Sequence, residues 1–109
     1  MSYNIKSISQ FDKQLKRLVK KYPSFKSDFF DFVIELKTNP IQGTSLGNNC
    51  YKIRVAISSK GKGKSGGARI ITNLQVMDNL VFLLTIYDKS EQSDITDKDL
   101  QALLKKIIK

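Results

Sequence analysis

The sequence has no histidine and a single cysteine, and these two absences exclude several common kinds of site. Without histidine, the chain lacks the commonest metal ligand and the side chain whose ordinary pKa best suits acid–base catalysis near neutral pH. Cys50 cannot form a disulfide within the chain, and there is no CxxC pair to hold zinc. We therefore expect no metal and no cofactor, and any catalysis must use other side chains.

Long apolar runs are also missing. No stretch approaches the roughly 18 apolar residues that a membrane-spanning helix needs, and residues 1–10 lack the apolar core of a signal peptide. We therefore expect a cytoplasmic protein. The chain has 109 residues, which fits one domain over residues 1–109, and its 40% hydrophobic and 27% charged residues are typical of a globular protein. A domain this small buries a modest share of its surface, so we expect marginal stability without a partner.

The positive charge is concentrated in one part of the chain. The formal net charge is +9, and no acidic residue occurs between Glu35 and Asp78. This stretch carries seven cationic residues: Lys37, Lys52, Arg54, Lys60, Lys62, Lys64 and Arg69. Such concentration favours a site for a polyanion, because attraction to phosphates is mostly electrostatic. A solvated basic surface without function is the alternative.

Apolar residues at helical spacing predict three helices. The first begins at Ser9 and Asp12, which have the spacing of a capping box, and ends at Pro23. The second begins near Ser24 and ends at Asn39–Pro40, so the two helices form a hairpin. A third amphipathic helix follows the capping-box pair Thr96 and Asp99 near the C-terminus.

The strands are predicted by alternation and by runs of apolar residues. A short strand opens the chain at residues 3–8, residues 43–49 are polar and predict a loop, and three strands follow at residues 51–57, 68–76 and 80–87. The resulting order is β-α-α-β-β-β-α. It predicts an α+β domain with an N-terminal helical hairpin and an antiparallel central sheet.

A glycine- and lysine-rich segment, here called the lysine loop (residues 58–67), joins two of these strands. It ends in Gly63-Lys64-Ser65 but lacks the first glycine of a P-loop, and a strand follows it rather than a helix, so nucleoside triphosphate binding is excluded. The remaining interpretations are a mobile basic flap and an ordinary flexible loop. In the first, Lys60, Lys62 and Lys64 contact the phosphates of a polyanion.

Cationic and phenolic side chains also gather on the predicted strands. Alternation places Lys52 and Arg54 on one face of the first strand, and Arg69 begins the neighbouring antiparallel strand. Tyr87 and Lys89 lie at the end of the last strand. Cations on a rigid sheet suit a phosphodiester, although they would also simply solvate an exposed face.

Three segments together resemble toxins of the RelE/HigB type, in the RelE/ParE superfamily. They are Tyr51-Lys52-Ile53-Arg54-Val55-Ala56, the run from Ser59 through Lys64-Ser65-Gly66-Gly67-Ala68-Arg69 to Ile71, and Leu83-Leu84-Thr85-Ile86-Tyr87-Asp88-Lys89-Ser90-Glu91. The helical hairpin, with its KKYPS segment and the Asn39-Pro40 turn, is similar to the same family's N-terminal half. The resemblance covers nearly the whole chain.

This resemblance implies a microbial ribonuclease fold and an endoribonuclease that cuts mRNA, often on the ribosome. It also implies a cognate antitoxin, for which we expect a helix-turn-helix protein. By position, Lys52, Arg54 and Arg69 match the family's catalytic cations, while Tyr87 and Lys89 fall where the family keeps further active residues. The chain departs from members that use histidine or a tyrosine closer to the C-terminus, since residues 93–96 read Ser-Asp-Ile-Thr.

Metal-free RNA cleavage needs a base for the 2′-hydroxyl, cations for the phosphorane and an acid for the leaving 5′-oxygen. The two guanidinium groups, Arg54 and Arg69, are the expected charge stabilisers. Lys52, crowded by other cations, is expected to have a lowered pKa and to act as the base, with Tyr87 as the alternative. Lys89 is expected to be an acid or a phosphate contact that Asp88 orients.

Two other functions fit parts of the sequence. One is a ParE-like toxin that inhibits DNA gyrase by binding, for which the sheet cations would not be needed. The other is a non-catalytic RNA-binding domain. Such domains usually stack bases on exposed sheet aromatics. Here only Tyr51, Phe82 and Tyr87 are candidates.

Overall fold

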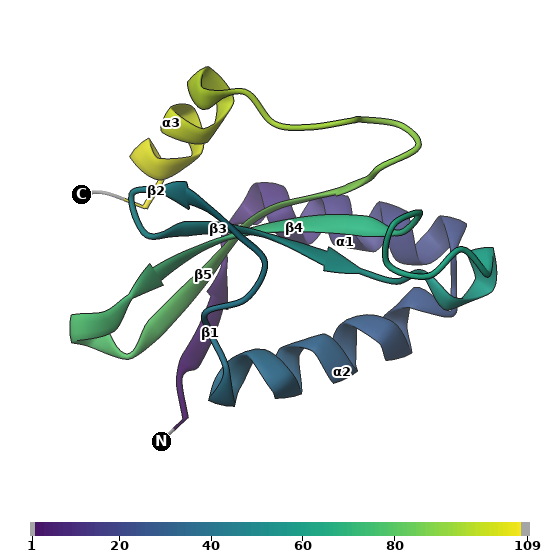
Figure 1. Ribbon diagram of the computed structural model, residues 1–109, viewed down its shortest axis with the longest axis horizontal. Helices are drawn as coiled ribbons and strands as arrows, with labels where there is room; N and C mark the ends of the chain where they lie inside the picture. The colour runs from purple at the N-terminus through teal and green to yellow at the C-terminus, as the bar shows by residue number, and fades with distance from the viewer. Residues whose placement is uncertain (1, 108–109) are drawn as a thin grey trace.

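The computed structural model describes residues 2–107 and contains three α-helices and five strands (Figure 1). The elements are β1 (Asn4–Ser7), α1 (Ser9–Lys21), α2 (Phe25–Thr38), β2 (Thr44–Gly47), β3 (Cys50–Val55), β4 (Ala68–Gln75), β5 (Leu80–Asp88) and α3 (Asp97–Lys105). Short 3-10 turns, η1 (Ser58–Lys60) and η2 (Val76–Asp78), precede β4 and β5. The α+β class, the helical hairpin and the order of the main elements are as the sequence predicted.

The five strands form one mixed sheet in the order β1-β5-β4-β3-β2. The strands from β2 to β5 pair antiparallel, whereas β1 pairs parallel with β5, so the prediction of an antiparallel sheet holds for the central strands and not for the β1 edge. Parallel neighbours need a crossover connection, and here α1, α2 and the strands β2 to β4 all lie between β1 and β5 in the chain.

The segment 43–49 is not a loop throughout, as the sequence predicted, because it contains β2. Gly47, Asn48 and Asn49 all have positive φ and turn the chain tightly, which brings Thr44 and Ser45 alongside Lys52 and Tyr51. Glycine and asparagine accept this left-handed backbone more readily than other residues. The polar composition concealed the strand because β2 lies at the sheet edge and is mostly exposed.

One of the two predicted capping boxes is confirmed in part and the other is wrong. The Thr96 hydroxyl accepts a hydrogen bond from the Asp99 N–H at 3.1 Å, as expected at the start of α3. At the start of α1, however, Ile8 is the N-cap residue and Ser9 already belongs to the helix. The Asp12 carboxylate accepts a hydrogen bond from the Ser7 hydroxyl instead.

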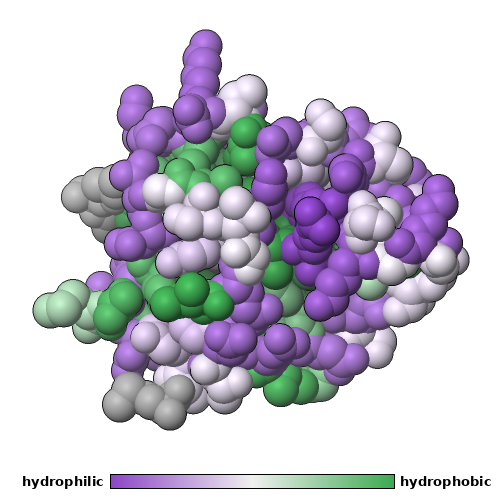
Figure 2. Space-filling model, in the orientation of Figure 1, coloured by the Kyte–Doolittle hydropathy of each residue, from purple (hydrophilic) through white to green (hydrophobic). Residues whose placement is uncertain are grey.

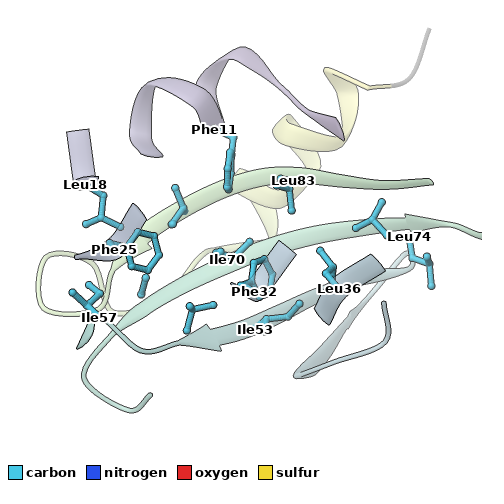
Figure 3. Packing of buried hydrophobic residues seen from close by; sticks show 14 residues of the cluster. Phe11, Leu18, Phe25, Phe32, Leu36, Ile53, Ile57, Ile70, Leu74 and Leu83 are labelled. Carbon is cyan, nitrogen blue, oxygen red and sulfur yellow. The ribbon is translucent and has the colours of Figure 1, made fainter. Parts of the chain in front are cut away.

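Helices cover both faces of the sheet, but unequally. In Figure 1, α2 runs below the sheet and α3 lies above it. The larger core lies between the sheet and the α1–α2 hairpin, and Figure 3 shows its side chains, among them Phe11, Leu18, Phe25, Phe32, Leu36, Ile53, Ile70 and Leu83. The short α3 packs Leu100, Leu103 and Leu104 over the opposite face, against Cys50, Ile71, Leu84 and Tyr87. No helix within residues 2–107 is long and apolar enough to cross a membrane.

Candidate functional site

A row of three side chains crosses the face of the sheet that α3 only partly covers. Arg54 of β3 is in register with Arg69 of β4, and Arg69 is in register with Tyr87 of β5. Residues directly opposite in antiparallel strands share a face, and so do residues two apart in one strand, which adds Lys52. The structure therefore brings Lys52, Arg54, Arg69 and Tyr87 together. We call them the cross-sheet row.

Arg54 is the most accessible cation of the cross-sheet row. It is exposed, and its guanidinium makes no hydrogen bond or ion pair with any residue that the structure describes. Lys52 is half-buried, and its ammonium contacts the Asp94 carboxylate at 3.1 Å. Lys52 is thus not surrounded by cations alone, which was the premise for expecting it to act as a base. A free guanidinium and a paired ammonium lie side by side.

Arg69 is buried, with 4% of its surface exposed, and its guanidinium is bound to the main chain of the lysine loop. Nη1 donates to the carbonyl oxygens of Lys64 at 3.0 Å and Ala68 at 3.2 Å, and Nη2 donates to that of Ser65 at 3.0 Å. Hydrogen bonds from a charged group are among the stronger ones in proteins. Arg69 therefore fixes the loop from beneath while its charge remains next to Arg54 and Tyr87.

Tyr87 has a buried hydroxyl for which the described residues supply no hydrogen-bond partner. Burial raises the pKa of Tyr87, the negative charge of Asp94 raises it further, and the positive charge of Arg69 acts in the opposite direction. The phenol is therefore protonated at neutral pH. It suits a proton donor better than the base that the sequence allowed as an alternative, and its unpaired O–H is costly unless a ligand accepts from it.

Lys60 forms the most buried ion pair of the described chain. Its ammonium donates to the Asp88 carboxylate at 2.6 Å, to the Gly66 carbonyl at 3.2 Å and to the Ser90 hydroxyl at 3.3 Å. Its charge also lies 5.3 Å from the centre of the Tyr22 ring. Asp88 thus pairs with Lys60 and does not orient Lys89 as expected. The ammonium of Lys60, expected to contact RNA, points into the protein.

The Asp88 carboxyl is charged in spite of its burial. Burial alone would raise its pKa, but the hydrogen bond from Lys60, two from Ser90 and the charge of Lys60 together lower it to about 2. The pair therefore clamps the base of the lysine loop to the end of β5. Such a buried pair is strongly destabilising to break, since the remaining partner keeps an uncompensated charge.

The lysine loop is ordered by these contacts, although its composition predicted a segment too flexible to order itself. At its start, the Asp28 carboxylate accepts hydrogen bonds from the Ser58 N–H at 2.9 Å and from the Ser58 hydroxyl. At its end, Gly67 lies so close to β3 that a Cβ there would be 2.3 Å from the Val55 carbonyl oxygen. Between these points, Lys62 and Lys64 are exposed, and their ammonium groups have no partner among residues 2–107. Figure 2 shows mainly hydrophilic atoms over this end of the molecule.

The model of the family described as the RelE toxin of the RelE/RelB toxin–antitoxin system matches the chain over residues 10–109. The chain belongs to the RelE toxin family. The fold is also similar to that of a double arginine-to-alanine mutant of the E. coli toxin RelE in the free state, with a TM-score of 0.63 and 17% sequence identity. That likeness covers 99% of this chain and 100% of the E. coli chain, and it shows the shared fold.

As a RelE-family member, this protein is a type II toxin whose family implies a cognate antitoxin. Its site contains one residue that the sequence did not single out, Asp94. The Asp94 carboxylate accepts from the Ile95 N–H at 2.8 Å and from Lys52, and the same two contacts, in that order, lower its pKa. Asp94 lies in the irregular segment between β5 and α3, where no periodicity marks a residue. The only sequence signal for Asp94 was its position in residues 93–96, the segment where the resemblance implies a functional tyrosine in other members.

Lys89, the last of the predicted catalytic residues, is exposed at the end of β5, one position beyond the buried Asp88. Its side chain has no partner in the part of the chain that the structure describes. Within those residues, no group of three or more histidine, cysteine or acidic side chains is placed to hold a metal ion. The side chains gathered at the candidate site are cations, one phenol and one carboxylate.

Proposed function

We propose that this toxin is a metal-independent endoribonuclease that cleaves mRNA on the ribosome and is neutralised by its antitoxin. The observation that supports the proposal most is the cross-sheet row. Three neighbouring strands place Lys52, Arg54, Arg69 and Tyr87 on one face, and Arg54 is the exposed member of the row. A scissile phosphate bound there would meet fixed positive charge where negative charge develops in the transition state.

The roles follow from burial and partners. Arg54 and Lys52 contact the phosphate directly, and Arg69 adds its charge from below while it holds the lysine loop. Tyr87 donates a proton to the leaving 5′-oxygen, because its phenol is protonated and its hydroxyl is unpaired. The 2′-hydroxyl is the nucleophile, and the Asp94 carboxylate beside Lys52 accepts its proton.

The lysine loop and Lys89 extend the site along the RNA. Lys62 and Lys89 neutralise phosphates on either side of the cleaved bond, and Lys64 also contacts the RNA, since all three are exposed and unpaired among the described residues. Lys60 acts through the loop, because its ammonium is bound to Asp88. The loop is already ordered in the free protein, but the Tyr87 hydroxyl is buried, so RNA binding has to uncover this hydroxyl before it donates a proton.

The nature of the product ends tests this proposal. Attack by the 2′-hydroxyl leaves a 2′,3′-cyclic phosphate and a 5′-hydroxyl. We expect these ends when purified toxin is incubated with mRNA-programmed ribosomes, and we expect co-expression of the product of an adjacent reading frame to relieve growth arrest. A toxin that arrests growth and blocks gyrase supercoiling while mRNA stays intact would instead be ParE-like.

A further inference from the structure

A hollow of about 180 Å³ lies where α2 faces the edge of β3. The pairing of β3 with β2 ends at Lys52, so Arg54 lies beyond that pairing, at the margin of the sheet. The walls carry side chains of both charges. The hollow is lined by Asp28, Asp31, Phe32, Glu35, Arg54, Val55, Ala56 and Lys64. We call it the β3-edge hollow.

Four of its charged groups are available to a ligand. Asp28 is occupied, because it binds the start of the lysine loop through Ser58. The other charged side chains that line the hollow are exposed, and none of them forms a hydrogen bond or ion pair with residues 2–107. They are Asp31, Glu35, Arg54 and Lys64. Two free carboxylates therefore face two free cations across one small hollow.

The hollow adjoins the proposed cleavage site. Arg54 belongs both to the hollow and to the cross-sheet row, and the Lys64 carbonyl is held by Arg69 of the same row. A second phosphate does not fit there, since two carboxylates would repel it. A neutral group that offers both hydrogen-bond donors and acceptors fits both pairs of charges. In RNA, that group is the base of a nucleotide next to the scissile phosphate.

Guanine matches this arrangement of charges best. Its O6 and N7 atoms are the usual acceptors for an arginine or lysine, and its amino group is a donor. Its Watson–Crick edge also places the N1–H beside that amino group, so one carboxylate can accept from both. Adenine and cytosine offer a carboxylate only their amino group, and uracil offers a single N–H.

We propose that the β3-edge hollow binds a guanine base beside the scissile phosphate, an inference that depends on the proposed ribonuclease function. The carboxylates of Asp31 and Glu35 accept from the Watson–Crick edge of the base. Arg54 and Lys64 donate to O6 and N7. The toxin would thereby select the sequence that it cuts through its own side chains.

Cleavage of mRNAs that differ in one base beside the cut tests the selection. With toxin and programmed ribosomes, we expect cleavage beside guanine to exceed cleavage beside the other bases by about tenfold or more, the scale of one well-formed base contact. Glu35→Gln should slow cleavage beside guanine and speed it beside the other three bases, since a negative charge near the phosphates is removed. Asp78→Asn, which removes the same charge at the distant turn between β4 and β5, should leave the preference intact.

Titration with free nucleotides separates this inference from the ribonuclease proposal. We expect 3′-GMP to bind more tightly than 3′-AMP, 3′-CMP and 3′-UMP, with NMR shifts centred on Glu35 and Arg54, and to lose that advantage in Glu35→Gln. Equal affinities for the four nucleotides would overturn the inference, as would a Glu35→Gln variant that cuts beside all four bases equally faster. If the toxin cuts no RNA, the ribonuclease proposal fails and the titration alone decides whether the hollow reads guanine.

Discussion

The ion pair between Lys60 and Asp88 should contribute more to stability than any other single pair of charges in the described fold. Only 12% of the Lys60 side chain and 1% of the Asp88 side chain are exposed, and the second oxygen of Asp88 has no hydrogen-bond partner among residues 2–107. Lys60→Met keeps the length of the side chain and removes its charge. The buried carboxylate then loses its cation, so we expect the free energy of unfolding to fall by about 3–5 kcal/mol.

Urea denaturation followed by circular dichroism measures this loss, and Lys89→Met is the matched control. Lys89 is exposed, so its replacement should change the free energy of unfolding by less than about 0.5 kcal/mol. Replacing both partners, as in Lys60→Met with Asp88→Leu, should recover much of the stability, because no charge is then left unpaired. A loss below about 1 kcal/mol in Lys60→Met, the range of an exposed pair, would refute the reasoning.

The same pair predicts how stability depends on pH. The pKa of Asp88 is about 2 in the folded protein, against an ordinary value of 3.8. Because the folded state lowers this pKa, the contribution is fully present above pH 3.8 and is lost as the pH falls through about 2. At about 1.4 kcal/mol for each pKa unit, it amounts to about 2–3 kcal/mol. An Asp88→Asn variant with the same acid dependence as the wild type would contradict this assignment.

Three further substitutions follow from the contacts of the site. Tyr87→Phe removes a buried hydroxyl without a partner, so the free energy of unfolding should stay constant or rise by about 1 kcal/mol. If the phenol is the acid, single-turnover cleavage should fall roughly a hundredfold. Lowered stability with unchanged cleavage would exclude that role. Arg69→Ala removes two hydrogen bonds to loop carbonyls and one to the Ala68 carbonyl of β4, so amide hydrogen exchange in residues 58–67 should accelerate. Unchanged protection would show that Arg69 does not hold the loop. Gly67→Ala places a Cβ against the Val55 carbonyl and should cost about 1–3 kcal/mol in denaturation, whereas wild-type stability would mean that the strands can separate there.

Regular patterns allowed most of the fold to be predicted from the sequence. Apolar spacing gave both helices of the hairpin, and Pro23 correctly marked the end of the first. The position of β2 could not be predicted, since it depends on a turn with three residues at positive φ and on pairing with a strand that comes later. The parallel pairing of β1 with β5 likewise joins segments more than seventy residues apart.

The sequence predicted which side chains share a face of the sheet, but not which of them are buried. Alternation along β3 places Lys52 and Arg54 on one face, and the register brings Arg69 beside them. Sequence patterns do not reveal which cations are buried, so nothing distinguished Lys60 and Arg69, which hold the loop, from cations that are free. Their burial depends on Asp88 and on loop carbonyls that only the folded chain brings near. Asp94 was missed for a similar reason.

Single-turnover cleavage of ribosome-bound mRNA by Arg54→Ala tests most directly whether the cations of the cross-sheet row bind the scissile phosphate. Arg17→Ala, which removes an exposed arginine from α1, is the control, and equal free energies of unfolding would show that both variants are folded. We expect Arg54→Ala to cleave roughly a hundredfold more slowly, as when a donor to a developing negative charge is removed, and Arg17→Ala to cleave at nearly the wild-type rate. Equal cleavage rates in the two variants would contradict a phosphate bound across β3, β4 and β5.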